Sequence, residues 1–265
     1  MITPVDLHLA ALPAEFDGLT VAAISDVHAE VRLGGARGVR ALVEQVNAAR
    51  PDLIVLLGDI VHHPRNAHRV LPLLEGLQAR EGVWACLGNH EHGFVWFSRY
   101  FGRWPGPSVE EWRELYRRIG AELLVNEARP LPRGGARIWL LGVDDAYSGR
   151  DDLRAALAQA DAAEFCLAAT HHPDLVERAQ IGAVDLLLAG HTHGGQVHIP
   201  VLGPVHVSCH KPRQRAMGLV RANGTLMYVT RGAGEGFPLR VGCPREIPLI
   251  RLCRPPQEEG PGGAA

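Results

Sequence analysis

Ten acidic, amide and imidazole side chains follow short apolar runs in the sequence. The runs occupy residues 19–25, 53–57, 83–87, 165–170 and 184–189. The side chains that follow them are Asp26, His28, Asp59, Asn89, His90, Glu91, His171, His172, His191 and His193. Carboxylate oxygen, amide oxygen and imidazole nitrogen, without a thiolate, suit Mn²⁺, Fe, Co²⁺ or Zn²⁺ better than Ca²⁺ or a structural thiolate zinc site.

The set contains more ligands than one ion needs, so two ions roughly 3.5–4 Å apart are the natural interpretation. Only two carboxylates, Asp26 and Asp59, would offset their four positive charges. The remaining charge can bind a phosphate and lower the pKa of a bound water to about 7. Each motif alone is weak, because an Asn often shapes a turn and His-x-His is common at surfaces. The ordered set of five predicts metal-dependent hydrolysis of a phosphate ester or anhydride.

Short apolar runs alternate with helical patterns along the first three quarters of the chain. Besides the five runs, residues 138–142 are predicted to form a strand. Helices are predicted at residues 38–49, 67–80, 108–119, 151–160 and 174–180. This order implies βαβ crossovers and a mostly parallel sheet, whose strands share one carboxyl edge where ligands bind. Later, residues 217–221 and 226–230 predict a hairpin around Asn223-Gly224, and residues 247–252 predict a last strand.

Composition favours one large α/β domain over residues 1–254, followed by a Pro/Gly/Glu-rich tail at 255–265 that is expected to be disordered. The net charge of −2 gives no overall attraction to nucleic acid or anionic membranes. Five scattered cysteines without a C-x-x-C motif fit a reducing compartment. Neither a signal peptide nor an 18-residue apolar run is present, so we expect a cytoplasmic protein.

The ordered motifs resemble those of the calcineurin-like metallophosphoesterase superfamily over about residues 19–253. They are Asp26-x-His28, Gly58-Asp59, Gly88-Asn89-His90-Glu91, His171 and Gly190-His191-Thr192-His193-Gly194-Gly195-Gln196. The last motif, with residues 231–234 and 244–247, resembles a bacterial branch that includes membrane-associated phosphoesterases and UDP-2,3-diacylglucosamine pyrophosphatases. The resemblance implies an α/β fold, a four-layer α/β/β/α sandwich, with two divalent metal ions. Mn²⁺ is the first choice, and Fe, Zn²⁺, Co²⁺ and Ni²⁺ are alternatives.

The resemblance also implies roles for individual residues. The first metal would bind Asp26, His28, Asp59 and His193, and the second would bind Asp59, Asn89, His171 and His191. His171 is preferred to His172 because the family motif places the ligand directly after the strand. His90 would protonate the leaving oxygen or stabilise charge on phosphorus, and Glu91 would orient His90.

The implied reaction is hydrolysis of a phosphomonoester, phosphodiester or pyrophosphate through attack by a metal-bridging hydroxide. We expect a small phosphorylated substrate, lipid-linked or nucleotide, without stable nucleic-acid binding; peripheral contact with a membrane stays open. The Asp-Arg-Gly continuation of Ser/Thr protein phosphatases is missing, and His62 stands where relatives often carry Asp. The alternatives are a cyclic-nucleotide phosphodiesterase and a non-catalytic scaffold with this fold.

Residues 94–116 contain 8 of the 15 aromatic residues of the chain. They either form a local packing core or cap the metals, in which case Trp96 and Phe97 would contact the substrate. Arg32 either donates to a substrate phosphate or is a solvated loop residue. Asp144-Asp145 either shapes a turn or lies near the site.

Overall fold

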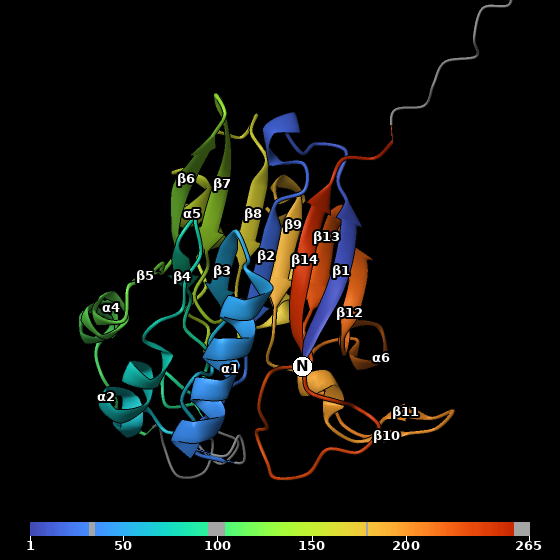
Figure 1. Cartoon of the computed structure of the whole chain (residues 1–265). Coiled ribbons are helices and arrows are strands. Elements are labelled where there is room, and N and C mark those ends of the chain that lie inside the picture. Colours follow the sequence, from blue (N-terminus) through green and yellow to red (C-terminus); the bar gives the residue numbers. More distant parts are fainter. Residues whose placement is uncertain (32–34, 95–103, 179, 257–265) are drawn as a thin grey trace, which may run out of the picture.

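Two six-stranded sheets form the centre of a computed structural model that describes residues 1–31, 35–94, 104–178 and 180–256. The first sheet has the order β1 (Ile2–His8), β14 (Ile247–Cys253), β2 (Thr20–Ile24), β3 (Leu53–Leu56), β4 (Val83–Ala85) and β5 (Ala121–Leu123). The second has the order β12 (Gly218–Ala222), β13 (Thr225–Val229), β9 (Leu186–Ala189), β8 (Cys166–Ala169), β7 (Ala136–Gly142) and β6 (Glu127–Arg133). Figure 1 shows the two sheets overlapping, with the strands of the first sheet in front of those of the second.

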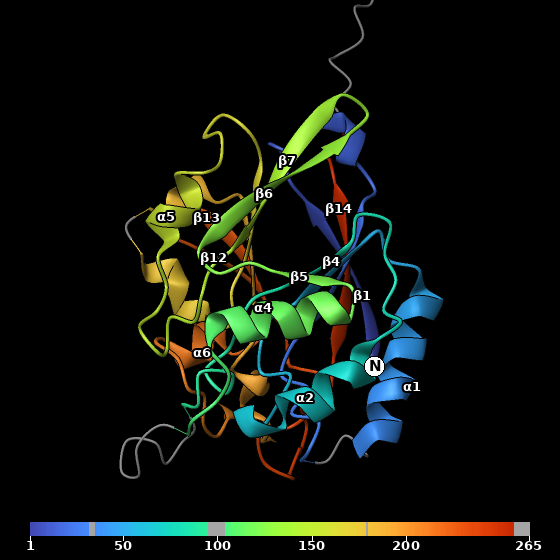
Figure 2. The same ribbon diagram turned by 90° about the vertical axis from the view of Figure 1, so that its left-hand side faces the viewer.

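Helices cover the outer face of each sheet. The first sheet is covered by α1 (Gly35–Ala49), α2 (Ala67–Val70) and α4 (Val109–Arg118), and the second by α5 (Leu153–Leu157) with the 3-10 turns Pro173–Glu177 and Ile181–Ala183. Figure 2 shows α1 on one side of the sheets and α5 on the other. The predicted four-layer α/β/β/α sandwich is therefore confirmed.

Three apolar layers separate the four layers of secondary structure. In β2, Ala22 and Ile24 pack toward the helices, whereas Val21 and Ala23 pack between the sheets. Successive side chains of a strand point to opposite faces, so a continuous apolar run is what a strand buried on both faces requires. The same reasoning applies to β3, β8 and β9, whose residues are all buried.

The predicted parallel strands are present, with antiparallel pairs toward the edges. β2, β3, β4 and β5 are parallel in the first sheet, as are β7, β8, β9 and β13 in the second. The predicted hairpin is β12–β13, and both turn residues have positive φ, 50° at Asn223 and 87° at Gly224. Sequence analysis missed β1, β5, β6 and the short pair β10 (His198–Ile199) and β11 (Gly203–Pro204). In β6 two prolines hide the pattern, because proline is tolerated only at a sheet edge.

Several helices are shorter than predicted. The helix expected at 67–80 ends after Val70 and continues as the 3-10 turn Leu71–Leu74, because Pro72 lacks an N–H group and clashes with the preceding turn. Among the described residues of the segments 151–160 and 174–180, the structure has α5 and the 3-10 turn Pro173–Glu177 in place of the longer helices that were predicted. The helix expected at 108–119 is present as α4 and starts with a reciprocal capping box between Ser108 and Glu111.

Two of the eight clustered aromatic residues, Trp112 and Tyr116, are buried against the first sheet. Residues 95–103 lie outside the described part of the chain, as do all but the first two residues of the expected tail 255–265. Among the described residues, none of the helices combines the length and apolarity needed to cross a bilayer.

Replacing Leu167→Ala tests the layer between the sheets. Leu167 is fully buried there, so its truncation should lower the free energy of unfolding by about 2–5 kcal/mol in a urea titration. The matched control is Leu219→Ala on the edge strand β12, where the side chain is 54% exposed and the loss should stay within about 0.5 kcal/mol. Equal losses in the two variants would contradict the assigned layers.

Candidate metal centre

The strand ends turn sharply inward at the expected metal ligands. Five of the seven adopt left-handed backbone, with φ of 53° at Asp26, 40° at His28, 52° at Asp59, 67° at His191 and 51° at His193. This conformation costs an L residue about 1–3 kcal/mol and persists only where the surrounding structure holds it. Close packing supplies that constraint, since a Cβ on Gly58 would lie 2.5 Å from the backbone nitrogen of Gly88.

One group of ligand atoms comes from the loops that follow β2 and β9. Nε2 of His193 lies 3.2 Å from Nε2 of His28 and 3.3 Å from Oδ1 of Asp26. These three residues can offer one ligand atom each within 4.8 Å of one another. They are three of the four residues expected at the first metal, Asp59 being the fourth, and we call these three the first cluster.

The second cluster consists of Asp59, His171 and His191, whose ligand atoms also lie within 4.8 Å of one another. Nε2 of His171 is 3.2 Å from Oδ2 of Asp59 and 3.1 Å from Nδ1 of His191. Oδ1 of Asn89 lies 2.9 Å from that Nδ1, and the amide of Asn89 is turned by a hydrogen bond from its Nδ2 to the carbonyl of Phe94.

Asp59 lies between the two clusters. Its Oδ2 is 3.2 Å from Nε2 of His171 in the second cluster and 3.7 Å from Nε2 of His28 in the first. A single carboxylate oxygen thus faces both groups of imidazoles. This is the geometry expected of a bridging ligand.

The neighbouring His172 has both ring nitrogens engaged elsewhere. Its Nε2 lies 3.1 Å from the carbonyl of Ser208, and its Nδ1 accepts from the backbone N–H of Asp174 at 3.2 Å. His171 therefore is the member of this pair that faces the clusters, as expected from its position after β8.

The donor set fits a cation. Nδ1 of His171 lies 2.8 Å from the carbonyl of Leu57, so this nitrogen carries the proton and Nε2 directs a lone pair at Asp59. Two acceptors 3.2 Å apart repel each other unless a proton or a cation lies between them. Oδ1 of Asp26 is buried without a hydrogen-bond partner among the described residues. An ion in the second cluster would satisfy Nε2 of His171, and an ion in the first cluster would satisfy Oδ1 of Asp26.

Burial and the neighbouring charged groups determine the charge states of these residues in the metal-free protein. Burial alone would lower the pKa of His171, but the Asp59 carboxylate and its hydrogen bond raise that pKa to about 10. Burial lowers the pKa of His28, His191 and His193, and neighbouring imidazoles lower it further for each of them. Burial works against ionisation of Asp59, yet the imidazoles around it hold its pKa well below the usual range. A proton on His171 therefore takes the place that a cation would hold.

Glu91 is buried, and its carboxylate ties two loops together. It accepts four backbone N–H groups, those of Gly88 at 2.9 Å, Asp59 at 2.8 Å, Ile60 at 2.9 Å and Val61 at 3.3 Å. We expected Glu91 to orient His90, but its two oxygens face backbone instead. Burial raises the pKa of Glu91 and Asp59 adds to that effect, while the N–H groups of Asp59 and Gly88 oppose it.

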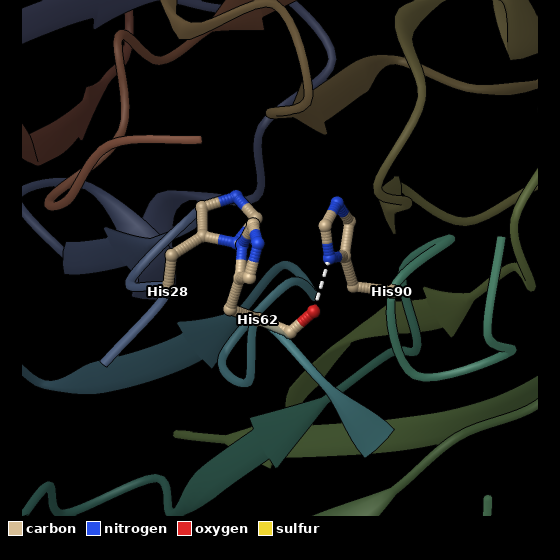
Figure 3. A group of neighbouring side chains, drawn as sticks. All are labelled: His28, His62 and His90. Carbon is tan, nitrogen blue, oxygen red and sulfur yellow. Dashed lines mark hydrogen bonds between the residues drawn. The ribbon is translucent and has the colours of Figure 1, made fainter. Parts of the chain in front are cut away.

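His90 is oriented by the carbonyl of His62. Nδ1 of His90 lies 2.6 Å from that oxygen, which leaves its Nε2 3.9 Å from Oδ2 of Asp59. Figure 3 shows this contact, with His28 beside the ring of His62. Nδ1 of His62 lies 3.3 Å from Nδ1 of His28, so His62 is placed to hold the ring of a first-cluster residue.

His28, His62 and His90 also have ligand atoms within 4.8 Å of one another. A third ion is a poor fit, because Nδ1 of His90 is already bonded to the His62 carbonyl and Nε2 of His28 faces the first cluster. We interpret this group as a hydrogen-bonded support. Sequence analysis gave His62 no role; the only signal was that it replaces the Asp often found in relatives.

Arg240 is the second functional residue that sequence analysis missed. Its buried guanidinium donates to four backbone carbonyls, those of His193 at 3.2 Å, Cys243 at 3.1 Å, and Arg231 and Gly234 at 2.6 Å each. These bonds fasten the loop between β13 and β14 to the turn that carries His193. Nothing in a Gly/Pro-rich loop sequence signals that an arginine in it is buried.

The remaining residues that were predicted to lie at or near the site differ in where the structure places them. Arg32, Trp96 and Phe97 lie outside the described residues. Asp145 accepts from the backbone N–H groups of Tyr147 and Ser148 and so shapes a turn. That turn also borders the site, because the Tyr147 ring lies 5.3 Å from the His191 ring.

A model of the calcineurin-like phosphoesterase family matches residues 19–195. The chain is 28% identical over 245 residues to the uncharacterized metallophosphoesterase YkuE of Bacillus subtilis, covering 91% of this chain and 81% of YkuE. It is 30% identical over 205 residues to phosphodiesterase YaeI of Escherichia coli, covering 77% of this chain and 71% of YaeI. Three other curated relatives are much longer, and the chain spans only 48% to 57% of them.

Among solved structures, the crystal structure of phosphopantetheinyl hydrolase (PptH) from Mycobacterium tuberculosis aligns with a TM-score of 0.50 and 14% sequence identity. The alignment covers 93% of this chain and all of PptH. At this identity the similarity concerns the fold alone.

Replacing Glu91→Gln should weaken the centre without changing side-chain size. The new NH₂ group would face backbone N–H donors, so unfolding free energy should fall by about 1–3 kcal/mol, and metal affinity should fall with it. Urea titration and metal titration of the same samples measure both effects. Glu110→Gln, on the exposed face of α4, is the matched control. Unchanged metal affinity in Glu91→Gln would contradict the role assigned to Glu91.

Metal binding should release protons, because at about pH 8 His171 is protonated in the metal-free protein and must lose its Nε2 proton to become a ligand. Calorimetric titration with Mn²⁺ in buffers of different ionisation enthalpy measures the number released. We expect about one proton more per chain in the wild type than in His171→Gln. Equal release by the two proteins would show that His171 carries no displaceable proton.

Proposed function

The chain belongs to the calcineurin-like phosphoesterase family, and we propose that it hydrolyses a phosphoester or pyrophosphate bond of a small substrate with two divalent metal ions. The observation that carries this proposal is the pair of ligand clusters joined by Oδ2 of Asp59. Two buried groups of acceptors, each short of positive charge, support a dinuclear centre better than a single ion.

In this proposal the first ion is held by Asp26, His28, His193 and Asp59, and the second by Asn89, His171, His191 and Asp59. Mn²⁺ is our first choice, and the oxygen and imidazole donors also suit Fe, Zn²⁺, Co²⁺ or Ni²⁺. When bound, the two ions would supply positive charge for the phosphoryl oxygens and activate a bridging water as the nucleophile.

His90 is our candidate for the proton donor. Its Nδ1 is committed to the carbonyl of His62, so Nε2 is the nitrogen left to meet a substrate. That nitrogen lies 3.9 Å from Oδ2 of Asp59 and is therefore within reach of a phosphate bound at the clusters. A protonated Nε2 would donate to the leaving oxygen or stabilise charge on phosphorus.

A cavity of about 700 Å³ beside the second cluster is our candidate for the leaving-group site. Its lining includes Tyr147, His172, Asp174, Arg178 and Lys211, so it suits a polar group better than an acyl chain. Tyr147 is 47% exposed, and its ring lies close to His191, where it could stack on a planar group. This feature supports the alternative of a cyclic-nucleotide phosphodiesterase, which a panel of nucleotide and sugar phosphates would test.

Replacing His90→Ala should separate catalysis from metal binding. Hydrolysis of bis(4-nitrophenyl) phosphate by the metal-loaded protein should fall by about 10²–10⁴-fold, because a general acid is lost, while bound metal per chain stays unchanged. His68→Ala, on α2, is the matched control and should keep wild-type activity.

Wild-type protein that binds two ions yet turns over no phosphomonoester, phosphodiester or pyrophosphate would contradict the enzyme proposal. That result would favour the non-catalytic scaffold. The complete set of candidate ligands argues against a scaffold, because proteins that lose an activity have no need to retain every ligand.

A further inference from the structure

Most exposed apolar side chains of the described residues gather beside the first cluster. Nine large apolar side chains are exposed among the described residues, and seven of them belong to two short segments. These seven are Ile199, Val201, Leu202, Val205, Phe237, Leu239 and Val241, and we call them the apolar rim. Scattered exposed apolar residues need no explanation, but a concentration of this kind marks an interaction surface.

The two segments of the apolar rim are joined to each other. Val197 and Val241 form a β-bridge, the N–H of His198 donates to the carbonyl of Val241, and Gln196 donates from Nε2 to the carbonyls of Phe237 and Leu239. The rim is thus one surface built from two loops.

This surface borders the metal centre. Gly236 directly precedes Phe237, and a Cβ placed on Gly236 would lie 3.2 Å from Nε2 of His193. Figure 1 shows the β10–β11 hairpin at lower right, at the end of the molecule where the loop between β13 and β14 runs. A surface that receives the rim would therefore also face the first cluster.

The tip of the β10–β11 hairpin is suited to burial in an apolar environment. Val201 is fully exposed and Leu202 is 69% exposed, so both side chains project largely into solvent. Residues 194–210 contain no Asp, Glu, Lys or Arg, which means that burial of this segment desolvates no formal charge.

Protein partners fit this surface less well. Pro200 and Pro204 lack N–H groups, which hinders addition of a strand to the hairpin edge. Seven side chains on two protruding loops also offer little of the roughly 800 Å² per partner that a stable protein interface buries. A bilayer surface, by contrast, accepts a protruding apolar tip without shape complementarity.

We propose that the apolar rim inserts into the surface of a phospholipid bilayer and holds the metal centre at headgroup level. The proposed lipid binding does not depend on whether the protein is an enzyme. Its consequence, that the substrate is a phosphate carried at a membrane, rests on the proposed function.

Flotation with vesicles of phosphatidylcholine and phosphatidylglycerol tests the insertion without any turnover. The wild type should float with the vesicles, and the double variant Val201→Ser/Leu202→Ser should show a partition coefficient at least about tenfold lower, because two exposed apolar side chains are lost. The matched control Leu219→Ser removes an equally exposed leucine on β12 outside the rim and should bind like the wild type. Hydrolysis of a soluble aryl phosphodiester should be equal in all three proteins.

Val201→Trp gives a second readout that does not depend on losing a function. Its indole should enter the interface and be quenched by lipids that carry bromine in their acyl chains. Wild-type protein that stays in the aqueous fraction, or equal loss of binding in the double variant and the control, would overturn the proposal. A dimer in sedimentation experiments that the double variant dissociates would also overturn it, because the rim would then be a protein interface.

Discussion

The close approach of lone pairs around Oδ2 of Asp59 is the constraint on which the rest of this structure depends. Imidazole nitrogens from both clusters face that oxygen, and the contacts between acceptors are unfavourable until positive charge lies among them. Their geometry must therefore be imposed by the surrounding chain. The strained left-handed backbone at five of the ligands is the local sign of that imposed geometry.

Two buried ionisable side chains hold the loops in place by binding backbone rather than each other. Glu91 collects four N–H groups from the loops after β3 and β4, and Arg240 gives hydrogen bonds to four carbonyls around the turn that carries His193. Hydrogen bonds to charged groups are stronger than neutral ones, and these satisfy loop groups that no strand can pair. Glu91 holds the loops on the Asp59 side of the centre, and Arg240 holds those on the His193 side.

Much of this arrangement was predictable, because the metal ligands follow buried strands and strand ends share one edge. The parallel central strands and the closeness of Asp26, His28 and His193 follow from that rule, whereas the four-layer sandwich was implied by the resemblance to a known family. What could not be predicted depends on tertiary contacts. The backbone role of Glu91, the support from His62 and the burial of Arg240 leave no periodic pattern, and β6 was hidden by its two prolines.

The bridging position of Asp59 is the central claim, and electron paramagnetic resonance of the Mn²⁺-loaded protein tests it most directly. Two ions that share a carboxylate oxygen lie roughly 3.5–4 Å apart and must be magnetically coupled. We predict two Mn²⁺ ions per chain with the multiline spectrum of an exchange-coupled pair. One ion per chain, or two ions with the spectrum of isolated Mn²⁺, would contradict it.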